Sequence, residues 1–110
     1  MIVSVNENHF REYIIHSSRK LIIAIFYAAW SKESEEMLKV VESISRKYTL
    51  LVDVLKVDVD VEKKLAAMGG IQRVPTTFIF NTGNDQPIAG FTGFVAENDL
   101  CVAIEKFLGR

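Results

Sequence analysis

The sequence has few of the features that stabilise secreted proteins or anchor membrane proteins. It contains one cysteine, Cys101, among 110 residues, so no disulfide can form within the chain. Structural disulfides belong to oxidising compartments, and a chain without them fits a reducing one. The longest apolar stretch, residues 21–30, has half of the ~20 residues that a membrane-spanning helix needs. Residues 1–8 lack the basic and then apolar layout of a secretory signal. These absences predict a cytoplasmic protein that does not act at a membrane.

The sequence has no large excess of either charge. Lys and Arg total 13 against 14 Asp and Glu, and neither sign forms a long block. A protein that binds nucleic acid or an anionic membrane would need a basic patch. We therefore expect neither as a partner, and proteins or small molecules are the expected partners instead.

Ligand sets for a metal ion or a phosphate group are also lacking. The two histidines stand seven positions apart, and the single cysteine is remote from both. Asp58 and Asp60 lack the glycine and the glutamate of a calcium-binding loop. The pair Gly69-Gly70 is not followed by the lysine and hydroxyl residue of a phosphate-binding loop. We expect no metal and no cofactor.

Apolar residues make up 49% of the sequence, enough for the core of a single domain that covers residues 1–110. Residues 21–27 are apolar without polar alternation, which is typical of a strand buried on both faces. The predicted elements are a strand at 2–5, a helix capped by Asn6, a strand at 21–27, an amphipathic helix at 34–48, a strand at 50–59, a helix at 61–68, strands at 76–81 and 88–92, and a last helix through 100–108. This βαβαβαββα order predicts an α/β fold with a mixed sheet between helical layers.

Four short sequence motifs occur at fixed places in this order of strands and helices. They are Phe26-Tyr27-Ala28-Ala29-Trp30 before the long helix, Lys56-Val57-Asp58-Val59-Asp60 at the end of the third strand, Val74-Pro75-Thr76 before the fourth, and Gly93 after the fifth. Their order and spacing closely resemble the thioredoxin family, in which the first of these stretches ends in Trp-Cys-Gly-Pro-Cys. The resemblance spans nearly the whole chain. It implies the thioredoxin fold, a central mixed five-stranded sheet flanked by helices.

The chain departs from that family at the reactive motif, which reads Trp-Ser-Lys-Glu-Ser from residue 30. Ser31 and Ser34 stand where the family has its two cysteines, of which the first attacks a disulfide as a thiolate and the second resolves the intermediate. A serine oxygen forms no exchangeable bond to sulfur, so no residue is catalytic in the sequence as written. The family's buried acid corresponds to Ile25, which removes the proton relay and leaves Lys56 without its usual partner.

The two residues that most suggest chemistry have structural explanations. Ser31 is expected to cap the following helix, with acidic residues in the first turn where the helix dipole favours them. A serine hydrolase would need a base from one of the two histidines, and neither lies in a nucleophile-elbow setting. Cys101 is expected to be partly buried and unreactive, because neither a cation nor a helix start accompanies it.

The resemblance also implies a binding surface that needs no sulfur. In the family, the proline of Val-Pro-Thr is cis, and the residue before it presents backbone groups to an extended polypeptide. Pro75 and Val74 take these places, beside Trp30. Positive charge from Lys32 and Arg73 is partly offset by Glu33, so acidic or polar segments are the expected ligands. The predicted peptide-binding residues are Trp30, Lys32, Arg73, Val74, Pro75 and Gly93.

Two classes of function remain open. The first is a redox-inactive thioredoxin-like domain that binds polypeptides as an adaptor or chaperone-like holder, and Gly-Phe-Thr-Gly at residues 90–93 resembles a stretch in certain bacterial holdases. The second is a thiol-disulfide oxidoreductase of cell redox homeostasis in which serine replaces native cysteine at 31 and 34. With those cysteines it would be a protein-disulfide reductase. The expected oligomeric state is a monomer or a weak homodimer formed through the Trp30 face.

Overall fold

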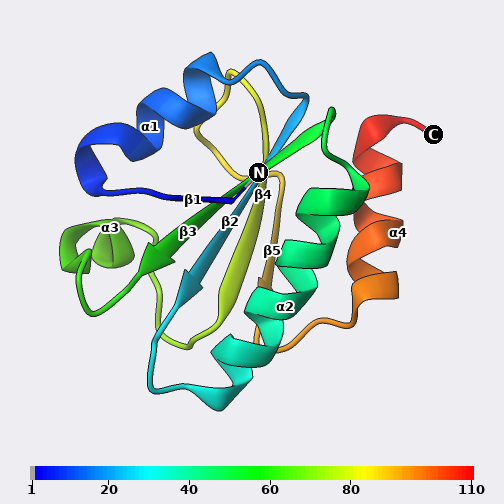
Figure 1. Cartoon of the computed structure of the whole chain (residues 1–110). Helices are drawn as coiled ribbons and strands as arrows, with labels where there is room; N and C mark the ends of the chain where they lie inside the picture. The colour runs from blue at the N-terminus through cyan, green and yellow to red at the C-terminus, as the bar shows by residue number, and fades with distance from the viewer. Residues whose placement is uncertain (1) are drawn as a thin grey trace.

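A computed structural model describes residues 2–110, which form four helices and a five-stranded sheet (Figure 1). The elements are β1 (Ile2–Ser4), α1 (Glu7–His16), β2 (Leu21–Tyr27), α2 (Lys32–Lys47), β3 (Val52–Asp58), α3 (Lys63–Met68), β4 (Thr76–Asn81), β5 (Ala89–Thr92) and α4 (Glu97–Leu108). The strands lie in the order β1-β3-β2-β4-β5. The pairs β1–β3 and β3–β2 are parallel, whereas β2–β4 and β4–β5 are antiparallel. The predicted βαβαβαββα order and mixed sheet are confirmed.

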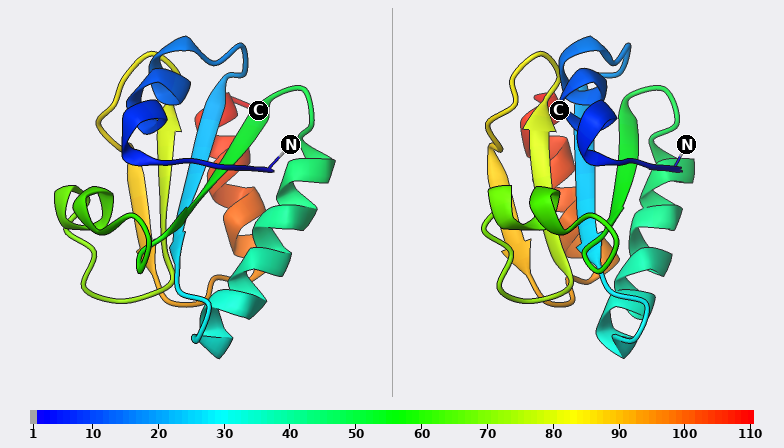
Figure 2. Two further views of the ribbon diagram at one scale, coloured as in Figure 1. Left: turned by 60° about the vertical axis from the view of Figure 1, so that its left-hand side comes forward. Right: turned by 90° about the vertical axis from the view of Figure 1, so that its left-hand side faces the viewer.

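The helices cover the sheet in two layers. Figures 1 and 2 show α1 and α3 on one face and α2 and α4 on the other. Each layer packs its own apolar cluster against the sheet. On the α1 and α3 side, four phenylalanine rings contact one another with centroids 5.7 to 6.2 Å apart. These rings belong to Phe10, Phe26, Phe78 and Phe80.

Strand β2 is the centre of both clusters. Its side chains alternate between the two faces, as the two-residue period of a strand requires. Leu21, Ile23 and Ile25 belong to the cluster under α2 and α4, while the residues between them belong to the cluster under α1 and α3. All of residues 21–26 are buried. The strand predicted to be covered on both faces is therefore confirmed.

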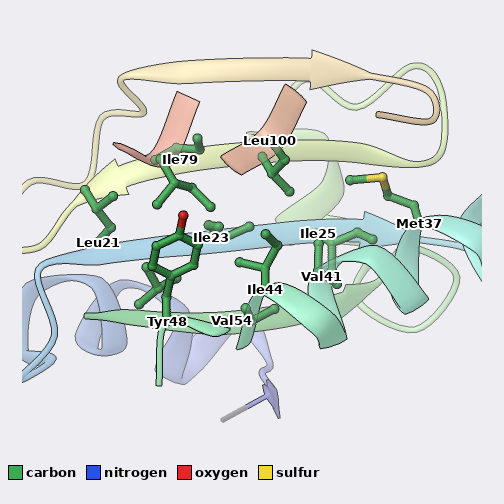
Figure 3. Packing of buried hydrophobic residues seen from close by; sticks show 12 residues of the cluster. Leu21, Ile23, Ile25, Met37, Val41, Ile44, Tyr48, Val54, Ile79 and Leu100 are labelled. Atoms are coloured by element: carbon green, nitrogen blue, oxygen red, sulfur yellow. The ribbon is translucent and has the colours of Figure 1, made fainter. Parts of the chain in front are cut away.

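The cluster under α2 and α4 is built from helical residues at the spacing that the sequence predicts. Met37, Val41 and Ile44 of α2 lie over Ile23 and Ile25 of the sheet (Figure 3). The opposite side of α2 carries charged residues, which remain in solvent.

Within residues 2–110, no helix combines the length and the apolar character that crossing a membrane requires.

Turns at the ends of elements explain where the observed bounds differ from the predicted ones. The strand predicted from residue 50 begins at Val52, because the Tyr48 carbonyl accepts hydrogen bonds from the N–H groups of Leu51 and Val52 in a turn. The helix predicted from residue 61 begins at Lys63, because a second turn closes on the carbonyl of Asp58. The sequence-based bounds of this strand and this helix are too long, because the adjoining turns also contain apolar residues.

Two β-branched positions on α4 provide a test of this packing. Ile104 is fully buried between α4 and the sheet, whereas Val102 on the same helix is 71% exposed. We expect Ile104→Ala to lower the free energy of unfolding by about 2–5 kcal/mol, because it leaves a cavity. The matched Val102→Ala variant should change it by no more than about 0.5 kcal/mol. Urea titration of both variants measures the difference, and equal effects would contradict the packing described.

Candidate functional site

Helix α2 begins at Ser31, which caps its first turn. Ser31 has an extended backbone, with φ −92° and ψ 117°, and its Oγ accepts a hydrogen bond from the N–H of Ser34 at 3.1 Å. The Ser31 carbonyl accepts the N–H of Glu35 at 3.0 Å. Glu33 and Glu35 place carboxylates in the first turn, where the helix dipole favours negative charge. The predicted N-cap is confirmed.

Ser34 is a second structural hydroxyl in the same turn. It is fully buried, and its Oγ accepts the N–H of Ala28 at 3.2 Å. Ser31 and Ser34 therefore each accept a backbone N–H and hold the chain between β2 and α2. His9 bonds to Asn6 instead, and within residues 2–110 neither histidine hydrogen-bonds to either hydroxyl. Among residues 2–110, neither histidine is therefore placed to act as a general base for these serines.

The loop before β4 contains the one cis peptide bond found in residues 2–110, between Val74 and Pro75. The Thr76 hydroxyl donates to the Arg73 carbonyl at 2.6 Å on one side of this bond. The Gly93 N–H donates to the Pro75 carbonyl at 2.7 Å, which ties the loop to the chain after β5. The predicted cis proline is present, and both of its neighbouring segments are fixed by hydrogen bonds.

An open depression lies between this loop, the start of α2 and α3. The residues that line it include Trp30, Ser31, Glu33, Lys63, Arg73 and Val74. The structure thus brings three of the six predicted peptide-binding residues, Trp30, Arg73 and Val74, to one place. Of the other three, Lys32 is exposed but does not line the depression, and Pro75 and Gly93 are buried. Pro75 and Gly93 therefore shape this region from beneath its surface.

Trp30 is 74% exposed, yet its ring is held in position. Its Nε1–H donates to Asp60 Oδ2 at 2.9 Å, and the Asp60 N–H in turn donates to Asp58 Oδ1 at 2.9 Å. The Asp60 carboxylate just after β3 therefore orients the indole, and Asp58 at the end of the strand fixes the backbone of Asp60. The sequence marked these residues only as the end of a strand, and nothing in their local pattern predicts the bond to Trp30.

Glu33 connects three segments of the site, a role that the sequence did not reveal. Its Oε1 and Oε2 each lie 3.2 Å from Arg73 Nη2, and its Oε2 accepts the N–H of Phe94 at 3.0 Å. These bonds join the start of α2 to the cis-proline loop and to the loop after β5. The sequence predicted that Glu33 offsets part of the positive charge. The structure shows that it pairs directly with Arg73.

The same contacts act on the titration of Glu33. The Phe94 N–H, followed by the Arg73 guanidinium, holds the pKa of the Glu33 carboxyl below its ordinary value. The carboxylate therefore stays charged into more acidic solution than an isolated glutamate would. The link between the three segments persists with it.

The position of the family's buried acid is filled by an apolar contact. Ile25 is fully buried and pairs in register with Thr77 of β4, whose hydroxyl is buried without a hydrogen-bond partner. Lys56, predicted to lack its usual partner, has its Nζ 5.8 Å from the centroid of the Tyr27 ring. A cation over an aromatic ring is a favourable contact. This lysine therefore has a structural role.

The sequence-based description of Cys101 is wrong in one respect. Cys101 is half-buried, as expected, but a cation does accompany it, because Lys47 Nζ lies 3.7 Å from its Sγ. Lys47 lies 54 positions away in the chain, at the end of α2, so only the packing of α2 against α4 brings the two together.

Hydrogen-bonding and charged groups characterise this site in the part of the chain that the structure describes. In the described residues 2–110, no group of three or more His, Cys, Asp or Glu side chains could hold a metal ion. The motif hydroxyls are hydrogen-bonded to the backbone, and no dithiol is present. The site presents a fixed indole, an ion pair and a cis-proline loop around one depression.

Comparison with known proteins identifies relatives of this chain. The model of the thioredoxin family matches residues 1–106. A thioredoxin of Staphylococcus haemolyticus is 31% identical over 107 residues, covering 97% of this chain and 98% of its own. Thioredoxin-1 of Drosophila melanogaster is 36% identical over 86 residues, or 78% of each chain. A thioredoxin of a Synechocystis strain is 30% identical over 104 residues, or 94% of each chain.

A solved structure supports the fold independently. The crystal structure of Chlamydomonas reinhardtii thioredoxin f2 superimposes with a TM-score of 0.82, covering 96% of this chain and 95% of that one. The two sequences are 19% identical, so this likeness concerns the fold alone.

The hydrogen bond of the Ser31 cap yields a prediction of its own. We expect Ser31→Ala to lower the free energy of unfolding by about 1 kcal/mol, because the Ser34 N–H loses its acceptor. Ser31→Asp keeps an acceptor oxygen and adds a charge that the helix dipole favours, so its stability should stay close to that of the starting protein. Urea titration at neutral pH compares the three proteins. An unchanged Ser31→Ala variant would show that the cap contributes nothing.

Proposed function

Since this chain belongs to the thioredoxin family, we propose that it binds polypeptide partners in the depression between Trp30 and Val74. The observation that supports the proposal is the place of these two residues, an exposed and fixed indole on one side and the residue before a cis proline on the other. An extended segment can use its backbone against such a loop and an apolar side chain against the ring. Neither contact requires sulfur.

Two candidate functions are compatible with such binding. The first is a redox-inactive domain that binds partners as an adaptor or holder, and the serines at 31 and 34 favour it. The second is a thiol-disulfide oxidoreductase in which serine replaces native cysteine at both positions. The family model and the three relatives, each a thioredoxin, support the second candidate better than the first.

The scaffold provides part of what dithiol exchange would need. A sulfur at position 31 would lie at the start of α2, where the helix dipole and the Ser34 N–H stabilise a thiolate. That thiolate would attack a partner disulfide and form a mixed disulfide, releasing one partner thiolate. A thiol at position 34, once deprotonated, would then attack the sulfur at 31 and release the second. With Ile25 in place of a buried acid, no carboxylate there accepts the proton of the resolving thiol.

A cytoplasmic location and a monomeric or weakly dimeric state stay predictions from the sequence. The first rests on the single cysteine and the absence of a long apolar run. The second rests on the exposed Trp30 face, which a second copy of the chain can cover.

Introducing sulfur at positions 31 and 34 tests the proposed function. We expect the double variant Ser31→Cys, Ser34→Cys to reduce insulin disulfides in the presence of dithiothreitol, because binding and chemistry would then occur at the same place. The single variant Ser31→Cys should form mixed disulfides without turnover. A control with Ser17→Cys and Ser18→Cys carries the same number of thiols away from the depression.

The outcomes separate the possibilities. Turnover by the Ser31, Ser34 double variant above that of the control supports polypeptide binding at this face. A normally folded double variant that is inactive, together with a Ser31→Cys variant that forms mixed disulfides no faster than the control, would overturn the proposal. The codons at 31 and 34 in the source genome then decide between the candidates, since serine codons leave the adaptor and cysteine codons the oxidoreductase.

A further inference from the structure

We propose that the Glu33 carboxylate occupies a subsite made by the Arg73 guanidinium and the Phe94 N–H, and that an acidic segment of a polypeptide partner displaces it. The proposal rests on the proposed function, because it names the chemistry that the binding face selects. The ligand class is an extended segment with an aspartate or glutamate beside the residue that contacts Val74.

The two segments that carry the donors are anchored by bonds that do not involve Glu33. The Arg73 carbonyl accepts the Thr76 hydroxyl at 2.6 Å, which anchors the arginine backbone. Phe94 follows Gly93, whose N–H donates to the Pro75 carbonyl at 2.7 Å. Neither of these bonds involves Glu33, so the Phe94 N–H and the backbone of Arg73 remain in position when the Glu33 side chain turns away. The exposed Arg73 guanidinium is then available to pair with a carboxylate from another chain.

Gly93 makes room for this arrangement. It has a positive φ of 81°, and a Cβ there would lie 3.0 Å from Arg73 Nη2 and 3.2 Å from Glu33 Oε2. The guanidinium and the carboxylate therefore lie directly against the glycine backbone. A side chain at this position would strain the backbone at its positive φ and would push the guanidinium and the carboxylate away from the glycine.

The contact made by Glu33 can be exchanged. The Arg73 side chain is 61% exposed and that of Glu33 is 37% exposed, and ion pairs this accessible to solvent stabilise a protein little. A partner carboxylate can make the same three hydrogen bonds, so the exchange replaces like with like. The net gain in binding free energy therefore comes from the attraction between the partner and the charged residues around the subsite.

That surrounding charge favours an acidic partner. Among the described residues that line the depression, Lys63 and Arg73 are cationic and Glu33 is the only carboxylate. Lys32, next to Glu33, is exposed as well. With Glu33 turned away, the lining has cations alone, and they complement a negative segment.

The experiment tethers peptides at the site. A Ser31→Cys protein, with Cys101→Ser to remove the other thiol, is mixed with blocked heptapeptides whose central cysteine forms a disulfide with thionitrobenzoate. The thiolate introduced at position 31 attacks the peptide sulfur, the protein–peptide disulfide forms, and the thionitrobenzoate thiolate leaves and is measured by its colour. Glutamate is placed, one peptide at a time, at each of the four positions nearest the cysteine, two before it and two after it. Each glutamate peptide is compared with the peptide that has glutamine at the same position.

We expect a glutamate peptide to react faster than its glutamine counterpart at one or more positions, by about twofold to fivefold, the range that an exposed ion pair supplies. This preference should grow in a Glu33→Gln background and disappear in an Arg73→Gln background. Glu35→Gln is the matched control, because it removes the same charge from the same helical turn without touching Arg73. Its effect on the preference should be smaller than that of Glu33→Gln.

Failure of this inference differs from failure of the proposed function. Each peptide rate is divided by the rate of the same protein with cysteine–thionitrobenzoate alone, which corrects for the reactivity of the thiol. If every corrected rate is no higher for the Ser31→Cys protein than for a Ser18→Cys protein that also carries Cys101→Ser, the depression binds no polypeptide and the proposed function falls. If the corrected rates are higher for the Ser31→Cys protein but glutamate and glutamine do not differ in any background, polypeptide binding stands and the carboxylate subsite is wrong. Equal effects of Glu33→Gln and Glu35→Gln would also overturn it, because general charge would then explain the preference.

Discussion

The burial of β2 between two helical layers is the constraint on which the rest of the structure depends. The strand is paired along both edges and covered on both faces, so it has no freedom to shift in register. Tyr27 at its end lies opposite Asp58 at the end of β3, and Phe26 lies opposite Thr76 at the start of β4. The turn to α2, the loop that orients Trp30 and the cis-proline loop therefore meet at the same end of the sheet, and their positions follow from this pairing.

Side-chain oxygens that accept backbone N–H groups fix the loops at this end of the sheet. Ser31, Ser34 and Glu33 each take an N–H from a different segment, the first turn of α2, the chain after β2 and the loop after β5. Two of these three acceptors stand where the family has reactive sulfur. In this sequence, hydrogen bonds to the Ser31 and Ser34 hydroxyls hold the turn between β2 and α2. Both serines therefore have a structural role at positions where the family has cysteine.

Features set by neighbouring residues could be predicted from the sequence, and features set by distant ones could not. The caps at Asn6 and Ser31, the buried character of β2 and the cis bond before Pro75 each depend on a few consecutive residues, or on a motif that the family shares. The bond from Phe94 to Glu33 joins positions 61 apart, and that from Lys47 to Cys101 joins positions 54 apart. Such contacts depend on how helices and loops pack in three dimensions. The ion pair at the candidate site and the cation beside Cys101 therefore emerged only from the structure.

The turn that contains Ser31 and Ser34 also determines how the domain responds to its surroundings. A pair of sulfurs in this place would exist in two forms, open or closed, according to the ambient reduction potential. Hydroxyl groups have one form at every potential, so the shape of this turn is the same in an oxidising and a reducing medium. With serine at both positions, a change of reduction potential leaves the geometry between β2 and α2 unaltered, and cysteine at both would make that geometry a function of the potential.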